Sequence, residues 1–377
     1  MASKLPSCTS TSRRHWIRLT RVCNQRCLFC HDRPNQNGGA APWAKIRADL
    51  KTGRRNRCSR IILSGGEPTL HPRFIDIVAL ARDLGYSHIQ VITNGRMFFY
   101  TEFLDRAIAA GLREITFSIH GHTARLHDAQ TRAPGSFAQA IVGLRNALAR
   151  RGLIVSADVV VNRMNVSQLK DILLFLIGLG VREFDLLHFS PFGDAWRNRR
   201  RIFYDAAAHL PQLRQALALS RRPDITLWTN RLPARYLDGF ESLIQPPEKL
   251  HDEVTGRRAD LRDWWQEAKP LPCRGARCRY CFLEDFCRDL ASLCRDGRVP
   301  AKELPACLPR TSLRRPPTFI KTQEADLDGF VRFYTRYRYF HKGGTCVRCA
   351  RRSGCAGVPI AHLRRAGPPK PLQAAHG

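Results

Sequence analysis

The chain has 377 residues, enough for about two domains of ordinary size. Hydrophobic residues make up 44% and charged residues 25%, which is usual for a globular protein and excludes a collagen-like or low-complexity chain. The longest apolar run, residues 172–181, is too short to span a bilayer. Residues 1–16 lack the apolar core of a signal peptide, so we expect a cytoplasmic protein with no membrane partner.

Two features of the composition are unusual, a net charge of +30 and a total of 14 cysteines. The charge indicates an acidic partner, such as a nucleic acid or an acidic peptide, or else arginines scattered over a solvated surface. In a reducing cytoplasm, closely spaced cysteines are more often metal ligands than disulfides. Three groups stand out: Cys23, Cys27 and Cys30; Cys273, Cys278, Cys281, Cys287, Cys294 and Cys307; and Cys346, Cys349 and Cys355.

From residue 15 to about 191, short β-rich runs alternate with amphipathic helical patterns, which predicts an α/β fold with parallel strands. The expected strands are residues 16–21, 60–64, 88–93, 114–119, 154–161 and 183–189. Six such units favour a partial (β/α)6 barrel of the TIM type over a complete eight-stranded one. Ligands of such sheets bind at the carboxyl ends of the strands, so we expect the chemistry in the loops that follow. Asn165 is the expected N-cap of the helix that runs to Leu179.

The pattern changes after Phe192. Residues 194–260 are expected to form helices and basic loops, and the chain from Pro270 onward is rich in cysteine, proline and arginine. We therefore expect one domain over residues 12–225 and a second over residues 226–377. Residues 270–377 contain nine cysteines and show little regular apolar pattern, so bound metal is expected to supply much of their folding energy.

The first expected strand leads directly into Cys23, Cys27 and Cys30. Three thiolates can hold a cubane iron–sulfur cluster and leave its fourth iron without a protein ligand. An open coordination position is what a catalytic metal centre needs. The alternative is a zinc loop with a distant fourth ligand such as His31.

The spacing C-x3-C-x-aromatic-C, with Phe29 as the aromatic residue, resembles the radical S-adenosylmethionine (SAM) superfamily, and the resemblance covers roughly residues 15–195. Its further motifs follow successive strands: Ser64-Gly65-Gly66-Glu67-Pro68, Thr93-Asn94-Gly95, Ser118-Ile119-His120-Gly121, Val160-Val161-Asn162 and Pro191-Phe192-Gly193. The resemblance implies an oxidoreductase in which a [4Fe-4S] cluster with an open iron reductively cleaves SAM. The resulting 5′-deoxyadenosyl radical would abstract a hydrogen atom from a substrate, so no acid/base pair is required.

The resemblance also implies a set of SAM contacts. Gly65 and Gly66 would let the ligand approach the backbone closely, and Glu67 or its neighbouring backbone would accept a hydrogen bond from the SAM amino group. Short polar groups at strand ends suit the ribose hydroxyls or the methionine carboxylate, although such residues also cap helices: Thr93, Asn94, Ser118 and Asn162. Phe29 would pack on the adenine or support the cluster loop. We expect His120, His122 and His127 to be structural.

The C-terminal cysteines resemble the SPASM or twitch extensions of this superfamily, because the spacing C-x2-C-x5-C occurs twice, at Cys278 and at Cys346. Six residues separate Cys287 from Cys294, where the family has three, so the ligand set of each cluster stays open. The resemblance implies one or two auxiliary [4Fe-4S] clusters. Zinc is the alternative, because C-x2-C also suits a tetrahedral zinc site.

Auxiliary clusters are frequent in family members that act on a peptide or protein, so we expect such a substrate, and an electron donor such as a flavodoxin or ferredoxin. Residues 330–340 interleave aromatic residues with arginines, which suits RNA or an acidic peptide, or a helix with one aromatic face on the core. RNA modification is therefore the alternative enzymatic function. A non-catalytic, metal-stabilised binding module is the alternative of another class, and it would have no use for an open iron site.

Overall fold

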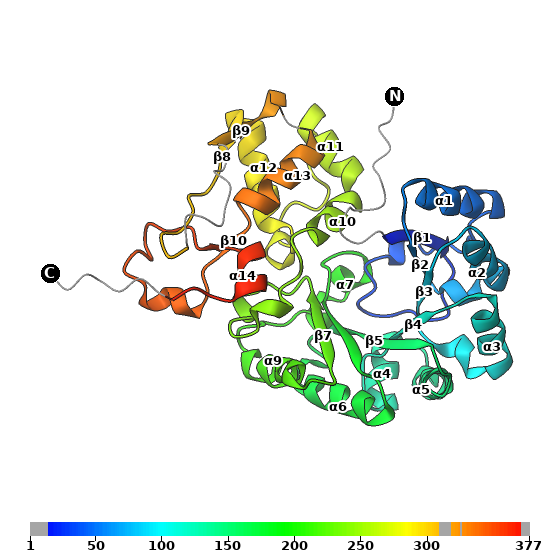
Figure 1. Cartoon of the computed structure of the whole chain (residues 1–377). Helices are drawn as coiled ribbons and strands as arrows, with labels where there is room; N and C mark the ends of the chain where they lie inside the picture. Colours follow the sequence, from blue (N-terminus) through cyan, green and yellow to red (C-terminus); the bar gives the residue numbers. More distant parts are fainter. Residues whose placement is uncertain (1–13, 309–317, 325, 371–377) are drawn as a thin grey trace. The chain divides into compact units, whose positions relative to one another are not determined.

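The computed structural model describes residues 14–308, 318–324 and 326–370 (Figure 1). The chain divides into two compact units, Met1–Trp228 and Thr229–Gly377. Residue 12, the expected start of the first domain, lies outside the described residues. Among the helices within these ranges, none has the length and apolar character needed to cross a membrane.

The first unit is built on a single β-sheet whose strands follow one another in chain order (Figure 1). The strands are β1 (Arg14–Thr20), β2 (Arg60–Gly65), β3 (His88–Thr93), β4 (Glu114–Ser118), β5 (Ile154–Val161), β6 (Glu183–His188) and β7 (Thr226–Asn230). The pairings from β1 to β6 are parallel, which confirms the predicted α/β class.

The seventh strand, β7, corrects the expectation of six strands and of helices and loops throughout residues 194–260. It has only five residues, so its local pattern is short, although threonine and tryptophan favour strands. Its place in the sheet depends on pairing with the neighbouring strand. A local sequence pattern cannot reveal that pairing.

Helices and short helical turns connect the strands, as parallel pairing requires. Their bounds are α1 (Trp43–Arg55), α2 (Phe74–Asp83), α3 (Thr101–Ala110), α4 (Ala124–Thr131), α5 (Ser136–Leu148), α6 (Leu169–Leu179), α7 (Gly193–Arg197), α8 (Arg199–Ile202) and α9 (Leu210–Leu217). In α2 the buried residues Phe74, Ile77, Val78 and Ala81 recur at helical spacing, so one apolar stripe faces the core. The central strands are buried on both faces, as Ile61, Ile62 and Leu63 in β2 illustrate.

The second unit is mainly helical (Figure 1). Its elements are α10 (Lys249–Thr255), α11 (Arg258–Glu267), α12 (Glu284–Asp296), α13 (Leu327–Tyr337) and α14 (Ile360–Ala366), with the antiparallel pairs β8 (Arg298–Pro300) with β9 (Phe319–Lys321) and β10 (Phe340–His341) with β11 (Val358–Pro359).

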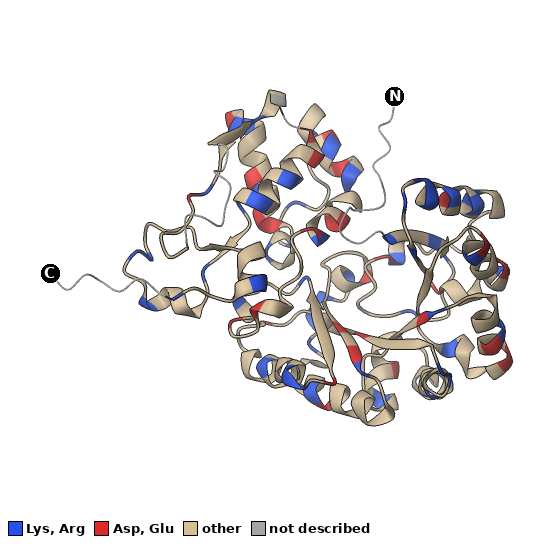
Figure 2. Ribbon diagram, viewed as in Figure 1, with Lys and Arg blue, Asp and Glu red and all other residues tan. Residues whose placement is uncertain are grey.

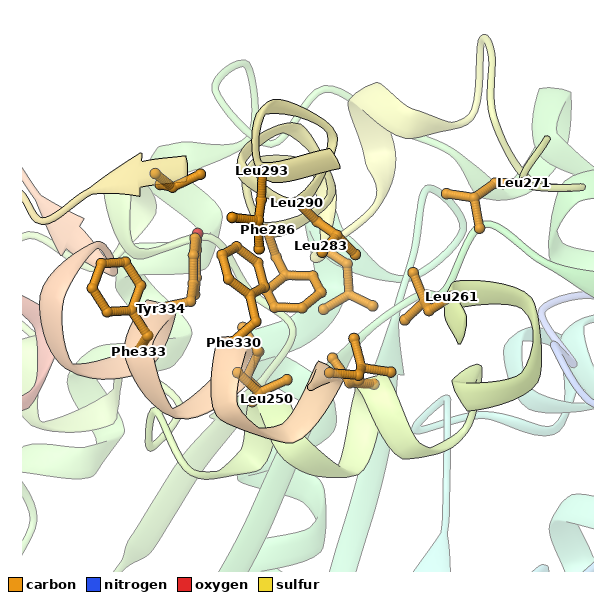
Figure 3. Packing of buried hydrophobic residues seen from close by; sticks show 14 residues of the cluster. Leu250, Leu261, Leu271, Leu283, Phe286, Leu290, Leu293, Phe330, Phe333 and Tyr334 are labelled. Carbon is orange, nitrogen blue, oxygen red and sulfur yellow. The ribbon is translucent and has the colours of Figure 1, made fainter. Parts of the chain in front are cut away.

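This unit has a hydrophobic core of its own, in which α12 and α13 pack together (Figure 3). Phe286 and Leu290 of α12 and Phe330 of α13 are at most 1% exposed. The expectation of little apolar pattern from residue 270 onward was therefore wrong for residues 271–299 and 327–334. Each helix contributes only a few apolar positions between charged ones, and they form a core only when the helices are assembled.

The aromatic residues of α13 face this core, whereas its arginines face outward. Phe330, Phe333 and Tyr334 are buried, and Arg332 and Arg336 are exposed. Of the two interpretations of residues 330–340, the structure supports the helix with an aromatic face packed on the core. The rings of Phe330, Phe333 and Tyr334 are therefore not available for stacking on nucleic-acid bases.

Candidate functional site

The loop that follows β1 carries Cys23, Cys27 and Cys30. All three side chains are half-buried. The thiols lie close enough to affect one another, because Cys27 is influenced electrostatically by both Cys23 and Cys30. Burial raises the pKa of Cys23 to about 12 and also raises the pKa of Cys27 and Cys30. The metal-free thiols therefore carry their protons at neutral pH, and metal binding must release them.

The backbone of this loop is held from two sides. The end of α4 accepts hydrogen bonds from the loop, with Arg26 N donating to Thr131 O at 2.9 Å and Leu28 N to Gln130 O at 2.8 Å. The start of α7, which follows β6, also contacts the loop, where Asp194 N donates to Cys30 O at 2.8 Å. The motif after the sixth strand thus contacts the last cysteine of the loop directly.

Gly193 makes this approach possible. Its φ is +54°, and a Cβ added there would lie 2.7 Å from Cys30 O and 2.5 Å from His31 O. A side chain cannot be accommodated at those distances, so the glycine lets the loop after β6 pack on the backbone of Cys30.

No group of three or more His, Cys, Asp or Glu side chains within the described ranges is arranged around a single metal ion. In an iron–sulfur cubane each thiolate binds a different iron, so its ligands lie farther apart than those of one zinc ion. The cysteine loop therefore remains a candidate for a cluster.

The glycines of the Gly65-Gly66-Glu67 motif bring two segments of backbone together. A Cβ on Gly65 would lie 2.5 Å from Thr20 O, and one on Gly66 would lie 2.2 Å from Val22 O. The N–H groups of Gly66 and Glu67 donate to those same carbonyls, each at 2.8 Å. On the side where a Cβ would project, the segment leading into Cys23 packs directly against these two glycines.

The Glu67 carboxylate, only 1% exposed, is fully engaged within the protein. It accepts hydrogen bonds from Thr69 N at 3.1 Å, Thr69 Oγ1 at 2.5 Å, Thr93 Oγ1 at 2.6 Å and Asn94 N at 2.7 Å. Burial, the largest influence, raises the pKa of Glu67, although these donors favour its ionised form. The side chain thus joins the ends of β2 and β3.

Asn94 continues this network to the cysteine loop. Its Nδ2 donates to Asn24 Oδ1 at 2.7 Å, and its Oδ1 accepts from Arg96 N at 3.1 Å. Arg96 also donates to Asn24 O at 2.7 Å and to Gln139 Oε1 at 2.6 Å. The end of β3 thereby holds the residue that follows Cys23.

Asn162 is completely buried, and its side chain is also engaged within the protein. Its Nδ2 donates to Gln130 Oε1 at 2.7 Å and to Val160 O at 2.9 Å, and its Oδ1 accepts from Met164 N at 2.9 Å. The expected N-cap, Asn165, makes no capping hydrogen bond to the helix that follows it. Instead its Oδ1 accepts from Asn162 N at 2.8 Å, because the tight turn after β5 brings that donor nearer.

His120 and His127 are buried beside this network with their rings stacked, the centroids 5.8 Å apart. Each Nδ1 accepts a backbone N–H at 3.2 Å, from Val160 for His120 and from His120 for His127. Burial lowers the pKa of His120 and brings that of His127 to about 4, so both are neutral at pH 7. Phe29 packs its ring against His120, with centroids 4.5 Å apart and planes at 73°.

Sequence reasoning missed Asn24, Arg96 and Gln130, which link the cysteine loop to β3 and α4. Gln130 is fully buried, and its Nε2 also donates to His120 O at 2.8 Å. The only feature of the sequence that pointed to these residues was their position next to motifs of the radical SAM family. The partners that make these links lie 32 to 72 residues away in the chain, beyond any local pattern.

In the second unit, Cys273, Cys278, Cys281 and Cys287 form a first group. Cys287 is influenced electrostatically by the other three, and burial raises its pKa to about 12. Cys278 Sγ lies 3.8 Å from Cys273 O, and Arg257 donates a hydrogen bond to Cys273 Sγ at 3.3 Å. Three of the group, Cys273, Cys281 and Cys287, also pack against the hydrophobic core.

A second group consists of Cys307, Cys346, Cys349 and Cys355, because the last three all act electrostatically on Cys307. Cys349 N donates to Cys346 O at 3.2 Å, and Gly357 N donates to Cys355 Sγ at 3.3 Å. The repeated C-x2-C-x5-C spacing therefore supplies three members of each group.

Cys294 lies apart from both groups. It is exposed on α12, two helical turns beyond Cys287, and burial alone accounts for the raised pKa of its thiol. No other cysteine acts electrostatically on its thiol, and its role as a metal ligand stays a prediction.

The model of the Radical SAM superfamily matches residues 17–176, so the chain carries a radical SAM domain, as its cysteine loop and strand-end motifs predicted. The chain is 31% identical over 181 residues to a probable GTP 3′,8-cyclase of Saccharolobus solfataricus, and 28% identical over 179 residues to one of Sulfurisphaera tokodaii. These matches cover 47% of this chain and 57% and 56% of the relatives, so the chain spans little more than half their length.

Solved structures also resemble the chain. Streptococcus suis SuiB bound to S-adenosylmethionine matches with a TM-score of 0.48 and 13% identity, over 98% of this chain and 78% of that one. The enzyme anSMEcpe with bound AdoMet and the Cp18Cys peptide matches with a TM-score of 0.45 and 11% identity, over 95% of this chain and 92% of that one.

The cofactors of the radical SAM family are a [4Fe-4S] cluster and SAM, and the donors of this chain fit them. Three thiols from one loop suit a cluster with one open iron. The two groups of four in the second unit suit clusters whose irons all have protein ligands.

Proposed function

We propose that this protein reductively cleaves SAM and abstracts a hydrogen atom from a peptide or protein side chain. The observation that carries the proposal is the three-thiol loop after β1, held by the Gly65-Gly66-Glu67 segment on one side and by the loop after β6 on the other. Since this site calls for reduced thiols and a low-potential donor, we propose a cytoplasmic location and a flavodoxin or ferredoxin as the donor.

Cys23, Cys27 and Cys30 would hold the catalytic cluster. When bound, the cluster and SAM supply the one-electron chemistry, and the chain supplies binding, orientation and exclusion of water. Glu67 is a positioning residue, because it orients Thr93 and Asn94 through hydrogen bonds.

Of the remaining residues expected to contact SAM, we assign one to the ligand and two to the support of neighbouring loops. We propose that Ser118, half-buried at the end of β4, contacts SAM directly. Asn162 would instead shape the loop after β5, and Phe29 would support the cluster loop through its contact with His120.

We assign one auxiliary [4Fe-4S] cluster to Cys273, Cys278, Cys281 and Cys287, and another to Cys307, Cys346, Cys349 and Cys355. In both, the four thiolates leave no iron open, so the substrate would not bind directly to these clusters. Their proposed role is to pass electrons between the substrate and the external donor.

A peptide or protein substrate is favoured by the two four-cysteine groups, because auxiliary clusters are frequent in peptide-modifying members of the family. A nucleotide such as GTP is the second candidate, because the curated relatives are probable GTP 3′,8-cyclases. RNA modification loses the support of Phe330, Phe333 and Tyr334, whose aromatic rings are buried. The positive charge is also distributed over both units, on helices and loops alike (Figure 2).

The first experiment tests the catalytic loop. Anaerobically reconstituted protein with a strong reductant is expected to convert SAM to 5′-deoxyadenosine. The triple variant C23A/C27A/C30A should lose this activity and keep the iron of the second unit, whereas the control C294A should retain both. Cleavage by the triple variant would contradict the assignment of the loop, and complete loss of iron would contradict the auxiliary clusters.

The second experiment separates the substrate classes. The protein is incubated with SAM and reductant, together with either GTP or a deuterated candidate peptide, chosen from any short reading frame found beside its gene. Deuterium transfer from the peptide into 5′-deoxyadenosine is expected. Turnover of GTP without transfer from the peptide would favour the nucleotide instead.

A further inference from the structure

Arg257 makes a contact that the proposed function does not use. It lies in the turn between α10 and α11, and its guanidinium donates a hydrogen bond to Cys273 Sγ at 3.3 Å. Its charge also acts on Cys281 and Cys287, where it favours the thiolate form. One cation therefore lies near three of the four thiols of the first auxiliary group.

The position of this arginine is fixed by its backbone. Arg257 N donates to Val254 O at 3.0 Å, and Arg257 O accepts from Leu261 N at 3.0 Å. Val254 and Leu261 are both buried in the hydrophobic core, 3% and 1% exposed. The turn that presents the guanidinium is thus anchored at both ends, and a substitution of the side chain leaves these bonds in place.

A cation beside an iron–sulfur cluster changes its redox equilibrium. Reduction adds one negative charge to the cluster, so a nearby positive charge stabilises the reduced state and raises the reduction potential. A hydrogen bond donated to a ligand sulfur acts in the same direction, because it withdraws electron density from the thiolate.

We propose that Arg257 raises the reduction potential of the auxiliary cluster held by Cys273, Cys278, Cys281 and Cys287, by donating a hydrogen bond to the Cys273 sulfur and placing a positive charge beside it. The inference rests on the proposed function, because it requires a cluster at these cysteines. A raised potential would make this cluster an acceptor of electrons within the second unit.

The test is an anaerobic redox titration of the full-length reconstituted protein, followed by electron paramagnetic resonance. The signal of this cluster is identified by its loss in C278A/C281A. In R257Q we expect unchanged iron content and a lower potential for this signal. R257K keeps the charge, so its potential should fall by less.

Arg274 provides the matched control. It is exposed beside Cys273 in the sequence and lies over the Trp264 ring, 6.0 Å from its centroid. R274Q removes the same charge without removing a hydrogen bond to a sulfur, so we expect a much smaller shift.

An unchanged potential in R257Q, or an equal shift in R274Q, would overturn the inference. If R257Q fails to take up this cluster, a wild-type potential in R257K would overturn it as well. If C278A/C281A loses neither iron nor signal, no cluster is bound there, and the auxiliary assignment of the proposed function fails with it.

Discussion

Short polar residues at strand ends have different roles at the residue scale, although they follow the same sequence pattern. Glu67 and Asn162 are buried and hydrogen-bonded to the protein, so they hold loops in place. Ser118 is only half-buried, and no hydrogen bond of its side chain is found among the described residues. Burial and hydrogen bonding therefore separate the structural residues from a candidate ligand contact.

This difference predicts opposite effects for two alanine variants. N162A removes three hydrogen bonds in a buried site, so the free energy of unfolding should fall by about 1–3 kcal/mol. S118A should leave stability unchanged and weaken SAM binding about threefold to tenfold, the equivalent of one hydrogen bond. Denaturant unfolding and calorimetric SAM titration measure the two quantities. The reverse outcome, with S118A destabilised and its SAM affinity intact, would contradict the assignment of Ser118 to the ligand.

The buried histidines predict a dependence of stability on pH. The pKa of His127 is about 4 in the folded state, below its ordinary value of about 6.5, so the unfolded chain binds the proton more readily. Stability is therefore complete above pH 6.5 and is lost as the pH falls toward 4, by roughly 2 kcal/mol at pH 5.

Hydrogen exchange of the buried amides in β4 and β5 of metal-free protein measures this effect without interference from cluster loss. The H127Q variant should lose less stability than the wild type between pH 7 and pH 5. Between pH 7 and pH 8 the stability of the wild type and of the variant should stay unchanged. An equal loss in H127Q and in the wild type would show that other groups govern the acid sensitivity.

The clearest case at the element scale is α13. Its sequence interleaves aromatic residues with arginines, and helical geometry separates the two kinds onto opposite faces. Phe330 packs against Phe286 of α12, with ring centroids 5.3 Å apart (Figure 3). The aromatic face thus stabilises the second unit.

F330A should destabilise the second unit by roughly 3–5 kcal/mol, because it leaves a cavity between α12 and α13. R336Q is the control on the same helix, and we expect its stability to change by less than about 0.5 kcal/mol. Thermal unfolding of the full chain measures both. RNA binding that is lost in F330A with unchanged stability would instead support a stacking surface.

At the scale of the whole molecule, the two units should differ in their need for metal. The first unit has a continuous sheet core, and the second has a core between residues 250 and 334. Residues 341–356, which carry Cys346, Cys349 and Cys355, contain no buried residue. Metal binding is therefore expected to order this segment above all others among the described residues.

Limited trypsin digestion of iron-free protein should cut first within residues 341–356, where Lys342, Arg348, Arg351 and Arg352 offer cleavage sites. Reconstituted protein should resist cleavage there. C346S/C349S should remain sensitive when iron is present, whereas C294S should behave as the wild type. Equal protection of this segment with and without iron would contradict the prediction.

The sequence by itself determined the class of the fold, six of the seven strands, and the loop of Cys23, Cys27 and Cys30 beside the Gly65-Gly66-Glu67 motif. These features are local, because strand periodicity, cysteine spacing and glycine motifs depend on residues near one another in the chain. The family match over residues 17–176 follows the same motifs.

Tertiary structure alone decided which side chains are engaged within the fold, how the C-terminal cysteines are grouped, and which face of α13 is buried. Glu67 accepts a hydrogen bond from Asn94 across 27 residues, and Cys355 acts electrostatically on Cys307, which lies on the other side of α13 in the sequence. A hydrogen bond or a ligand set formed over such separations depends on the packing of several elements. No single segment of the sequence carries that information.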